Sequence, residues 1–273
     1  MGRFDGVLIC TDLDGTLYKK DKTISKENRE AIEYFKSEGG YFTFITGRMP
    51  YYSMEAYRNV LPNVPFGCVN GGGLYDGEKM KYIWKTPIPC KVLELVRYIE
   101  EQRFDVGIQV SCFDKTHFIK ENGVMEYFRS VTGVPNLVCR ADDVKDPIAK
   151  IIFGSDSETD IREIENLLNS HPLASDFDFI RSERRLFEIL PKGVDKGLAL
   201  RKLSEYLGVD INRTVAVGDY NNDIGMFKAA KLGIAVANAC KDAIEAADYV
   251  TVSNEEHAIA RIICDIAEGV YTF

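Results

Sequence analysis

The chain has 273 residues, of which 45% are hydrophobic and 28% are charged, and its formal net charge is −8. This composition excludes a disordered chain and is typical of a folded globular protein. The negative charge repels phosphate backbones, and the longest apolar runs, such as residues 148–153, are too short to span a bilayer. We therefore expect neither a nucleic-acid partner nor a membrane partner.

Seven cysteines and three histidines are scattered along the chain. The cysteines form no CxxC pair, and we expect them to be reduced thiols that pack as small hydrophobic groups. The histidines are isolated from one another and give little support for a zinc site or a Ser-His-Asp triad. Because no apolar stretch near Met1 is long enough for a signal peptide, we expect a cytoplasmic protein.

Strands and helices alternate at both ends of the chain. The hydrophobic pattern predicts strands at 7–10, 41–45, 66–69, 214–218 and 232–236. Between them it predicts helices that begin at Ser25 or cover 54–61, 196–207, 223–230 and 255–267. Strand–helix–strand alternation with short loops predicts a parallel sheet with right-handed crossovers, so the fold class is α/β.

The middle of the chain has a different pattern. It predicts helices at 92–101 and 159–169, and strands at 106–112, 116–120, 149–154, 177–181 and 186–190. Neighbouring strands without a helix between them pair antiparallel. We therefore expect an α+β domain at 85–186, inserted into a discontinuous α/β domain formed by 1–84 and 187–273.

Two acidic clusters follow predicted parallel strands. Asp12 and Asp14 continue the first strand in the sequence Asp-Leu-Asp-Gly-Thr, and residues two apart on an extended chain can point the same way. Asp219, Asn222 and Asp223 follow the strand at 214–218 and resemble a hard-cation site. For Asp12 and Asp14 the structural alternative is a solvated acidic turn. For the second cluster it is a helix cap.

Two further clusters suit an anion. Thr46 and Gly47 follow the second strand and offer a hydroxyl and backbone amides, although an ordinary strand-to-helix turn has the same composition. Lys196 begins a helix, where the macrodipole disfavours a cation, so it is either a solvated surface residue or is held by an anion. All four clusters lie where open α/β sheets place their binding sites.

The order of these clusters resembles the haloacid dehalogenase-like (HAD) superfamily of phosphohydrolases. Residues 12–17 together with 218–223 are the most specific part of the resemblance, which spans the whole chain, and residues 70–72 and 237–239 are also similar. The match is to the Cof-type branch, which implies a Rossmann-like parallel-sheet core with a large inserted α+β cap. Glu256-His257-Ala258 departs from the usual Gly-Val of relatives, far from the motifs.

The resemblance implies a Mg²⁺-dependent phosphatase acting on small phosphorylated metabolites such as sugar phosphates. Asp12 would be the nucleophile that forms an aspartyl-phosphate, and Asp14 the general acid and base. Asp12, the Asp14 backbone carbonyl and Asp219 would hold Mg²⁺, while Asp223 orients that metal site.

The remaining family positions imply a phosphate pocket. Lys196 would neutralise the nucleophile and the phosphate, while the Leu13 and Gly47 amides, the Thr46 hydroxyl and the Asn222 side chain would bind phosphate oxygens. The inserted cap would act as a lid that excludes water and selects the leaving group.

Two other functions remain open on the sequence. A sugar phosphomutase of the same superfamily would transfer the phosphoryl group to a second hydroxyl, and release of inorganic phosphate distinguishes it from a phosphatase. A receiver-like binding module also uses an acidic Mg²⁺ pocket and a lysine, but Asp14 and the long insertion argue against it. No obligate protein partner is indicated.

Overall fold

The computed structural model describes residues 2–132 and 137–271, which form two compact units. The core unit consists of the chain up to Lys85 and from Asp195 onward, and the inserted unit is Thr86–Val194. The expected α/β fold with a parallel sheet is confirmed in the core unit. We describe each unit by itself.

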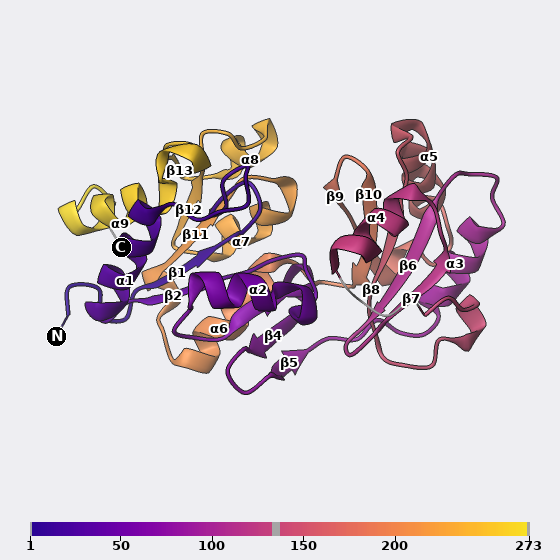
Figure 1. Ribbon diagram of the computed structural model, residues 1–273, viewed down its shortest axis with the longest axis horizontal. Helices are drawn as coiled ribbons and strands as arrows, with labels where there is room; N and C mark the ends of the chain where they lie inside the picture. The colour runs from indigo at the N-terminus through magenta and orange to yellow at the C-terminus, as the bar shows by residue number, and fades with distance from the viewer. Residues whose placement is uncertain (1, 133–136, 272–273) are drawn as a thin grey trace. The chain divides into compact units, whose positions relative to one another are not determined.

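The core unit contains a five-stranded parallel sheet in the order β13-β12-β11-β1-β2 (Figure 1). These strands are β1 (Leu8–Thr11), β2 (Tyr41–Phe44), β11 (Thr214–Gly218), β12 (Leu232–Ala235) and β13 (Tyr249–Val250). All four residues of β1 are buried, as expected for a central strand covered on both faces. The short edge strand β13 is not anticipated by the sequence pattern.

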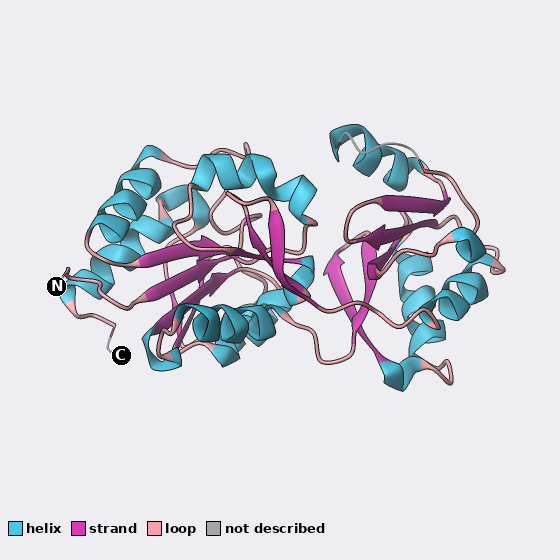
Figure 2. Ribbon diagram, turned by 90° about the horizontal axis from the view of Figure 1, so that it is seen from below, coloured by secondary structure: helices cyan, strands magenta, loops and turns pink. Residues whose placement is uncertain are grey.

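Helices cover both faces of this sheet (Figure 2). They are α1 (Lys26–Ser37), α2 (Pro50–Val60), α6 (Lys196–Leu207), α7 (Ile224–Ala229), α8 (Lys241–Ala246) and α9 (Ala258–Glu268). The chain moves from β1 to β2 in one direction along the sheet and from β11 to β12 in the other. Right-handed crossovers therefore place α1 and α7 on opposite faces. Helix α1 packs against α9, and α6 packs against α7.

A small antiparallel sheet of β3 (Phe66–Cys68), β4 (Gly73–Asp76) and β5 (Lys81–Lys85) completes the core unit. An isolated parallel bridge joins Ile45 to Gly67, so β3 continues from the edge of the main sheet. Helix α2 starts at Pro50, four residues before the expected 54, because proline at the first helical position has a suitable φ and needs no amide partner.

The inserted unit contains a five-stranded antiparallel sheet in the order β7-β6-β8-β10-β9. Its strands are β6 (Gly107–Cys112), β7 (Thr116–Lys120), β8 (Ile148–Gly154), β9 (Phe177–Glu183) and β10 (Leu186–Pro191). One face buries apolar side chains such as Val110, Ile151 and Phe187 in one cluster with residues of α3 (Val92–Glu100) and α5 (Glu158–Asn169). On the other face, Phe118 packs in a second cluster with residues of α4 (Gly123–Thr132).

The return from the inserted unit lies further along the chain than the sequence predicts. Strand β10 pairs with both β8 and β9, so it belongs to the inserted sheet. The boundary therefore falls between Val194 and Asp195, and not between 186 and 187. None of the seven cysteines, all of which lie within the described residues, forms a disulfide. No helix within residues 2–132 and 137–271 is long and apolar enough to cross a membrane.

Gly71 permits a close backbone approach beside the first turn of α6. Its φ is +98°, and a Cβ atom there would lie 1.8 Å from the carbonyl oxygen of Asp195. Only glycine adopts this φ readily and leaves room for that oxygen. The contact fixes the position of the residue that precedes α6.

We expect Gly71→Ala to lower the free energy of unfolding by more than Gly208→Ala does. Gly208 also has a positive φ, of +67°, but nothing lies within 4 Å of a Cβ added there. Gly208→Ala therefore measures the cost of backbone strain without a clash, which is about 1–2 kcal/mol. The clash at Gly71 adds about 1–3 kcal/mol. Urea unfolding of both variants measures the difference, and equal losses would contradict the role of the Asp195 contact.

Candidate active site

The acidic cluster after β1 and the acidic cluster after β11 meet because these two strands are neighbours in the sheet. Strand β1 pairs in parallel with β11, with Thr11 opposite Val217, and the Asp12 amide continues the ladder by donating to the Val217 carbonyl at 2.8 Å. Asp12 and Asp219 therefore leave the same carboxyl edge of the sheet. Asp12, Asp219 and Asp223 each place a carboxylate oxygen within 4.8 Å of the others.

Lys196 is the positive centre of this cluster. It is completely buried, and its Nζ lies 2.6 Å from Asp12 Oδ1 and 2.5 Å from Asp223 Oδ1. The Asp195 side chain caps α6 by accepting from the Leu198 amide at 2.7 Å, which fixes the helix start beside the acids. Of the two alternatives for a lysine at a helix start, the structure shows the anion-held one.

Asp223 is fixed by three donors. Its Oδ1 accepts from Lys196, and its Oδ2 accepts from the backbone amides of Asp219 and Tyr220 at 2.9 and 3.0 Å. The side chain is fully buried. This carboxylate therefore holds the loop after β11 in shape and positions Lys196.

Asp219 packs closely against the loop after β1. Its Oδ1 accepts from the Thr16 hydroxyl at 2.8 Å. Gly15 has a φ of +82°, and a Cβ there would lie 2.4 Å from Asp219 Oδ2. The Asp-Gly-Thr order therefore provides both the space and the hydrogen bond that bring Asp219 near Asp12.

The cluster carries more negative than positive charge. Burial raises the pKa of Asp12 to about 8, and the neighbouring acids add to this effect while Lys196 opposes it. Burial and the nearby Asp223 also raise the pKa of Asp219, to about 6. Three carboxylates facing one ammonium leave a surplus that a divalent cation would neutralise. These oxygen donors fit Mg²⁺, which prefers carboxylates and water.

Asp14 lies in a different environment from Asp12. The Arg48 guanidinium donates to both of its carboxylate oxygens, from Nε at 3.0 Å and from Nη2 at 2.8 Å, and Lys22 Nζ donates to Oδ1 at 2.8 Å. Burial acts to raise the pKa of Asp14, but these two cations outweigh it and lower that pKa. Asp14 is therefore ionised while Asp12 shares its charge with Lys196.

The expected phosphate-binding residues gather around Asn70. The Asn222 side chain donates to Asn70 Oδ1 at 3.1 Å, and a Cβ at Gly47 would lie 2.8 Å from that same oxygen. Thr46 is buried, and its hydroxyl accepts from the Arg48 amide at 3.2 Å. The Leu13 side chain is fully buried in the loop between Asp12 and Asp14.

Comparison with known proteins gives the same picture. The sequence model of the haloacid dehalogenase-like hydrolase family matches residues 9–263, which is nearly the whole chain.

The chain belongs to the haloacid dehalogenase-like hydrolase family.

Several curated relatives of this HAD hydrolase are named phosphatases. The 5-amino-6-(5-phospho-D-ribitylamino)uracil phosphatase YitU of Bacillus subtilis is 28% identical over 261 residues, covering 94% of this chain and 96% of that one. A second 5-amino-6-(5-phospho-D-ribitylamino)uracil phosphatase of Bacillus subtilis, YwtE, is 27% identical over 292 residues, covering 96% of this chain and 99% of that one. The protein is therefore an enzyme of the phosphoric monoester hydrolase class.

Solved structures share the fold across almost the full length. A haloacid dehalogenase-like hydrolase from Bacteroides thetaiotaomicron is 26% identical with a TM-score of 0.79, covering 95% of this chain and 99% of that one. A subclass IIB sugar phosphatase of the superfamily has a TM-score of 0.83 at 21% identity, covering 95% and 98%. The latter likeness concerns the fold alone.

Three further residues contribute to the site of this HAD hydrolase although they were not predicted from the sequence: Arg48, Asn70 and Thr16. Arg48 directly follows Thr46 and Gly47, and its charge next to an anion-binding turn was an available signal. Asn70 has a φ of +50°, a conformation that asparagine tolerates better than most residues, within the Asn-Gly-Gly sequence. Thr16 adjoins the acidic motif, but only the structure shows its bond to Asp219.

We expect Lys196→Met to destabilise the metal-free protein by about 3–5 kcal/mol, because it leaves Asp12 and Asp223 buried without their cation. Thermal or urea unfolding in the presence of a chelator measures this. Adding Asp223→Asn to Lys196→Met removes one of the two stranded charges and should recover part of the loss. A double variant that is less stable than Lys196→Met alone would contradict this account.

The stability of the metal-free wild type should also fall as pH rises. The folded-state pKa of Asp12 lies at about 8, above its ordinary value of 3.8, so the folded state binds more protons between these values. The contribution of Asp12 is therefore fully present below pH 4 and is lost as pH rises through about 8. Unfolding of Asp12→Asn over the same range should show a smaller slope, and the part due to Asp219 should remain below about pH 6. An identical slope in both proteins would assign it to groups other than Asp12.

Proposed function

We propose that this HAD hydrolase is a Mg²⁺-dependent phosphatase that hydrolyses small phosphorylated metabolites through an aspartyl-phosphate on Asp12. The observation that carries the proposal is the contact of Asp12 Oδ1 with the buried Lys196 at 2.6 Å, beside Asp219 and Asp223. This arrangement supplies a nucleophilic oxygen and the positive charge that a phosphate dianion requires.

Asp12 is suited to attack phosphorus. A carboxylate and a phosphate 4 Å apart repel by about 4 kcal/mol per pair of unit charges at an effective dielectric constant near 20. The Lys196 ammonium offsets this repulsion because it contacts the nucleophile directly. In the first step one Asp12 oxygen bonds to phosphorus while the bond from phosphorus to the leaving alkoxide breaks.

Asp14 is suited to the proton transfers. The leaving alkoxide needs a proton in the first step, and the attacking water must lose one in the second. Its ion pairs with Arg48 and Lys22 favour the ionised form, which is the form that accepts a proton from water. We propose that binding of the phosphate draws these cations partly away from Asp14, which then carries the proton needed in the first step.

The phosphate oxygens would be held by the Thr46 hydroxyl, the Leu13 and Gly47 amides, and the Asn222 side chain. Asn70 bonds to Asn222 and adjoins Gly47, so it keeps these groups in place. Mg²⁺ bound by Asp12, Asp219 and the Asp14 carbonyl, with Asp223 behind them, would neutralise charge on the transferring phosphoryl group. Donors arranged in advance in this way need little rearrangement during the reaction.

The names of relatives support a polyol or sugar phosphate as the substrate. YitU and YwtE are named for a phosphorylated ribityl chain, which is a small polyol monophosphate attached to a pyrimidine. We propose that this protein acts on a sugar phosphate or a related organic phosphate, and that the inserted unit selects the leaving group. A phosphomutase would use the same aspartyl-phosphate and differs in passing the phosphoryl group to an acceptor other than water.

We expect Asp12→Asn to lower phosphate release by at least about a thousandfold with the fold intact, because an amide is a far weaker nucleophile. The assay measures inorganic phosphate from a panel of sugar, nucleotide and cofactor phosphates. Asp242→Asn, an exposed residue of α8, is the matched control and should keep wild-type activity. Near-normal release by Asp12→Asn would contradict the assignment; isomerised sugar phosphate without release would indicate the phosphomutase.

We expect EDTA to abolish phosphate release and Mg²⁺ to restore it, because the three acids need a divalent cation to offset their charge. Asp219→Asn should require a higher Mg²⁺ concentration for half-maximal activity than the wild type, since it removes one anionic donor. Activity that persists after exhaustive chelation would rule out the cation dependence.

A further inference from the structure

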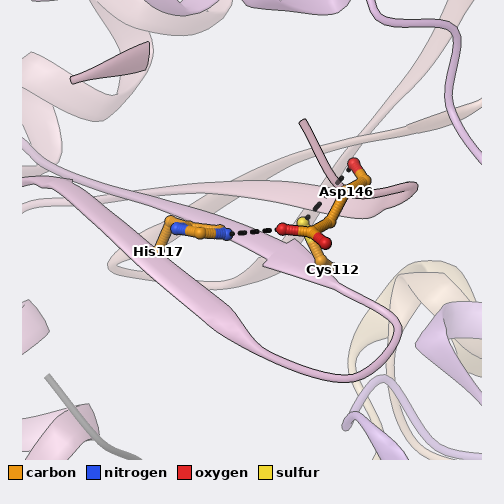
Figure 3. A group of neighbouring side chains, drawn as sticks. All are labelled: Cys112, His117 and Asp146. Atoms are coloured by element: carbon orange, nitrogen blue, oxygen red, sulfur yellow. Dashed lines mark hydrogen bonds and ion pairs between the residues drawn. The ribbon is translucent and has the colours of Figure 1, made fainter. Parts of the chain in front are cut away.

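A second group of metal-ligating side chains lies in the inserted unit, away from the acidic cluster in sequence. Cys112 ends β6, and His117 lies in β7 opposite Val110, so the two side chains share one face of the sheet. Asp146 precedes β8, whose first residue pairs with Cys112. Figure 3 shows the three side chains directed toward one another.

The donor atoms of these residues converge. A cysteine sulfur, an imidazole nitrogen and a carboxylate oxygen from Cys112, His117 and Asp146 all lie within 4.8 Å of one another. Cys112 is completely buried and His117 is 8% exposed. A metal ion bound between them would therefore be largely shielded from solvent, and only Asp146 is partly exposed.

The imidazole is oriented toward the centre of this group but is poorly satisfied there. Its Nε2 is buried and makes no well-aligned hydrogen bond, and lies 3.4 Å from Asp146 Oδ2 in an ion-pair contact (Figure 3). The Cys112 thiol makes only a weak contact, 3.8 Å from the backbone carbonyl of Asp146. A buried ring nitrogen whose partner is a carboxylate oxygen as far away as 3.4 Å keeps its capacity for a shorter bond to a bound ion.

The other neighbours hold the group in a geometry suited to metal binding. Cys139 Sγ lies 3.4 Å from His117 Nδ1, so it can accept a hydrogen bond from the Nδ1–H group. That tautomer leaves the Nε2 lone pair facing Cys112 and Asp146. Lys115 Nζ forms an ion pair with Asp146 Oδ1 at 3.1 Å, so the other carboxylate oxygen, Oδ2, is the one that faces His117. Two of the three ligands, His117 and Asp146, are therefore oriented by a partner outside the group.

We propose that Cys112, His117 and Asp146 form a binding site for a zinc-class transition-metal ion in the inserted unit. One thiolate, one imidazole and one carboxylate are the donors that Zn²⁺ accepts, whereas Mg²⁺ prefers oxygen alone. On binding, the metal–sulfur bond forms as the Cys112 thiol releases its proton to solvent. Three protein ligands leave a fourth position of the tetrahedron for water. This site is separate from the proposed phosphatase chemistry and does not depend on it.

Co²⁺ absorption tests the site on the full-length protein, since Co²⁺ takes the place of Zn²⁺ and gives a charge-transfer band only when a thiolate binds it. With Mg²⁺ in excess to occupy oxygen-only sites, we expect the wild type to show this band with one equivalent of Co²⁺. Cys112→Ser should lose the band. Cys240 lies beside the acidic cluster, since its backbone amide donates to the Asp219 carbonyl. Cys240→Ser should therefore keep the band; its loss would place the bound Co²⁺ at the acidic cluster.

Zn²⁺ affinity, measured by competition with a chromophoric chelator, gives an independent readout. We expect His117→Gln to bind Zn²⁺ at least about tenfold more weakly, and Cys139→Ala, which removes the acceptor, to bind about 10–100-fold more weakly while keeping the Co²⁺ band. Cys90→Ser, at an exposed cysteine of the same unit, should match the wild type. Circular dichroism verifies that each variant is folded.

The proposal fails if the wild type shows no thiolate band, or if the band survives in Cys112→Ser. It also fails if His117→Gln, folded as the wild type, binds Zn²⁺ equally well. Either result would make the Cys112–His117–Asp146 group a structural contact between β6, β7 and the segment before β8.

Discussion

The ammonium group of Lys196 is the constraint on which the core unit depends. It is completely buried and joins Asp12, at the end of β1, to Asp223, in the loop after β11. Asp12 lies 184 residues before Lys196 in the sequence, and the whole inserted unit comes between the two. A charge with no access to water is stable only where its counter-ions are fixed, so the helix cap, the two strand ends and the Asp223 hydrogen bonds must all form together.

Two carboxylates two residues apart acquire opposite properties from their surroundings. Asp12 is buried among acids, which makes it hard to ionise, and Lys196 is the cation that compensates it. Asp14 lies between two cations that keep it ionised. Separation of the pKa values of neighbouring carboxyl groups is the general means by which one site obtains distinct acid–base roles. Here the separation comes from the burial of Asp12 and from Arg48 and Lys22 beside Asp14, while Lys196 acts against it.

The positions of the acidic motifs could be predicted because they depend on chain-local features. Buried strands have a clear apolar pattern, and parallel topology brings the residues after β1 and β11 to one edge. Asn70 and Arg48 were not assigned because their roles arise from contacts between loops. The predicted boundary at 186 divided β10 from the inserted unit, although the pattern of the middle of the chain included a strand at 186–190. A hydrophobic pattern does not show that β10 pairs with both β8 and β9. The Cys112–His117–Asp146 group has no characteristic spacing, since a hairpin and a distant loop bring it together.

The place of β1 in the sheet has a consequence for the order of folding during synthesis. Its neighbour β2 follows within a few dozen residues, but its other neighbour, β11, is made only after the whole inserted unit. Until then one edge of this mostly apolar central strand has no partner, and such edges promote aggregation. The inserted unit is made of consecutive residues and can close its own sheet first. At that stage the emerging chain consists of a core sheet that is still open at β1, followed in the sequence by a closed inserted unit. Chaperone binding at this stage would protect the open edge of β1 from aggregation.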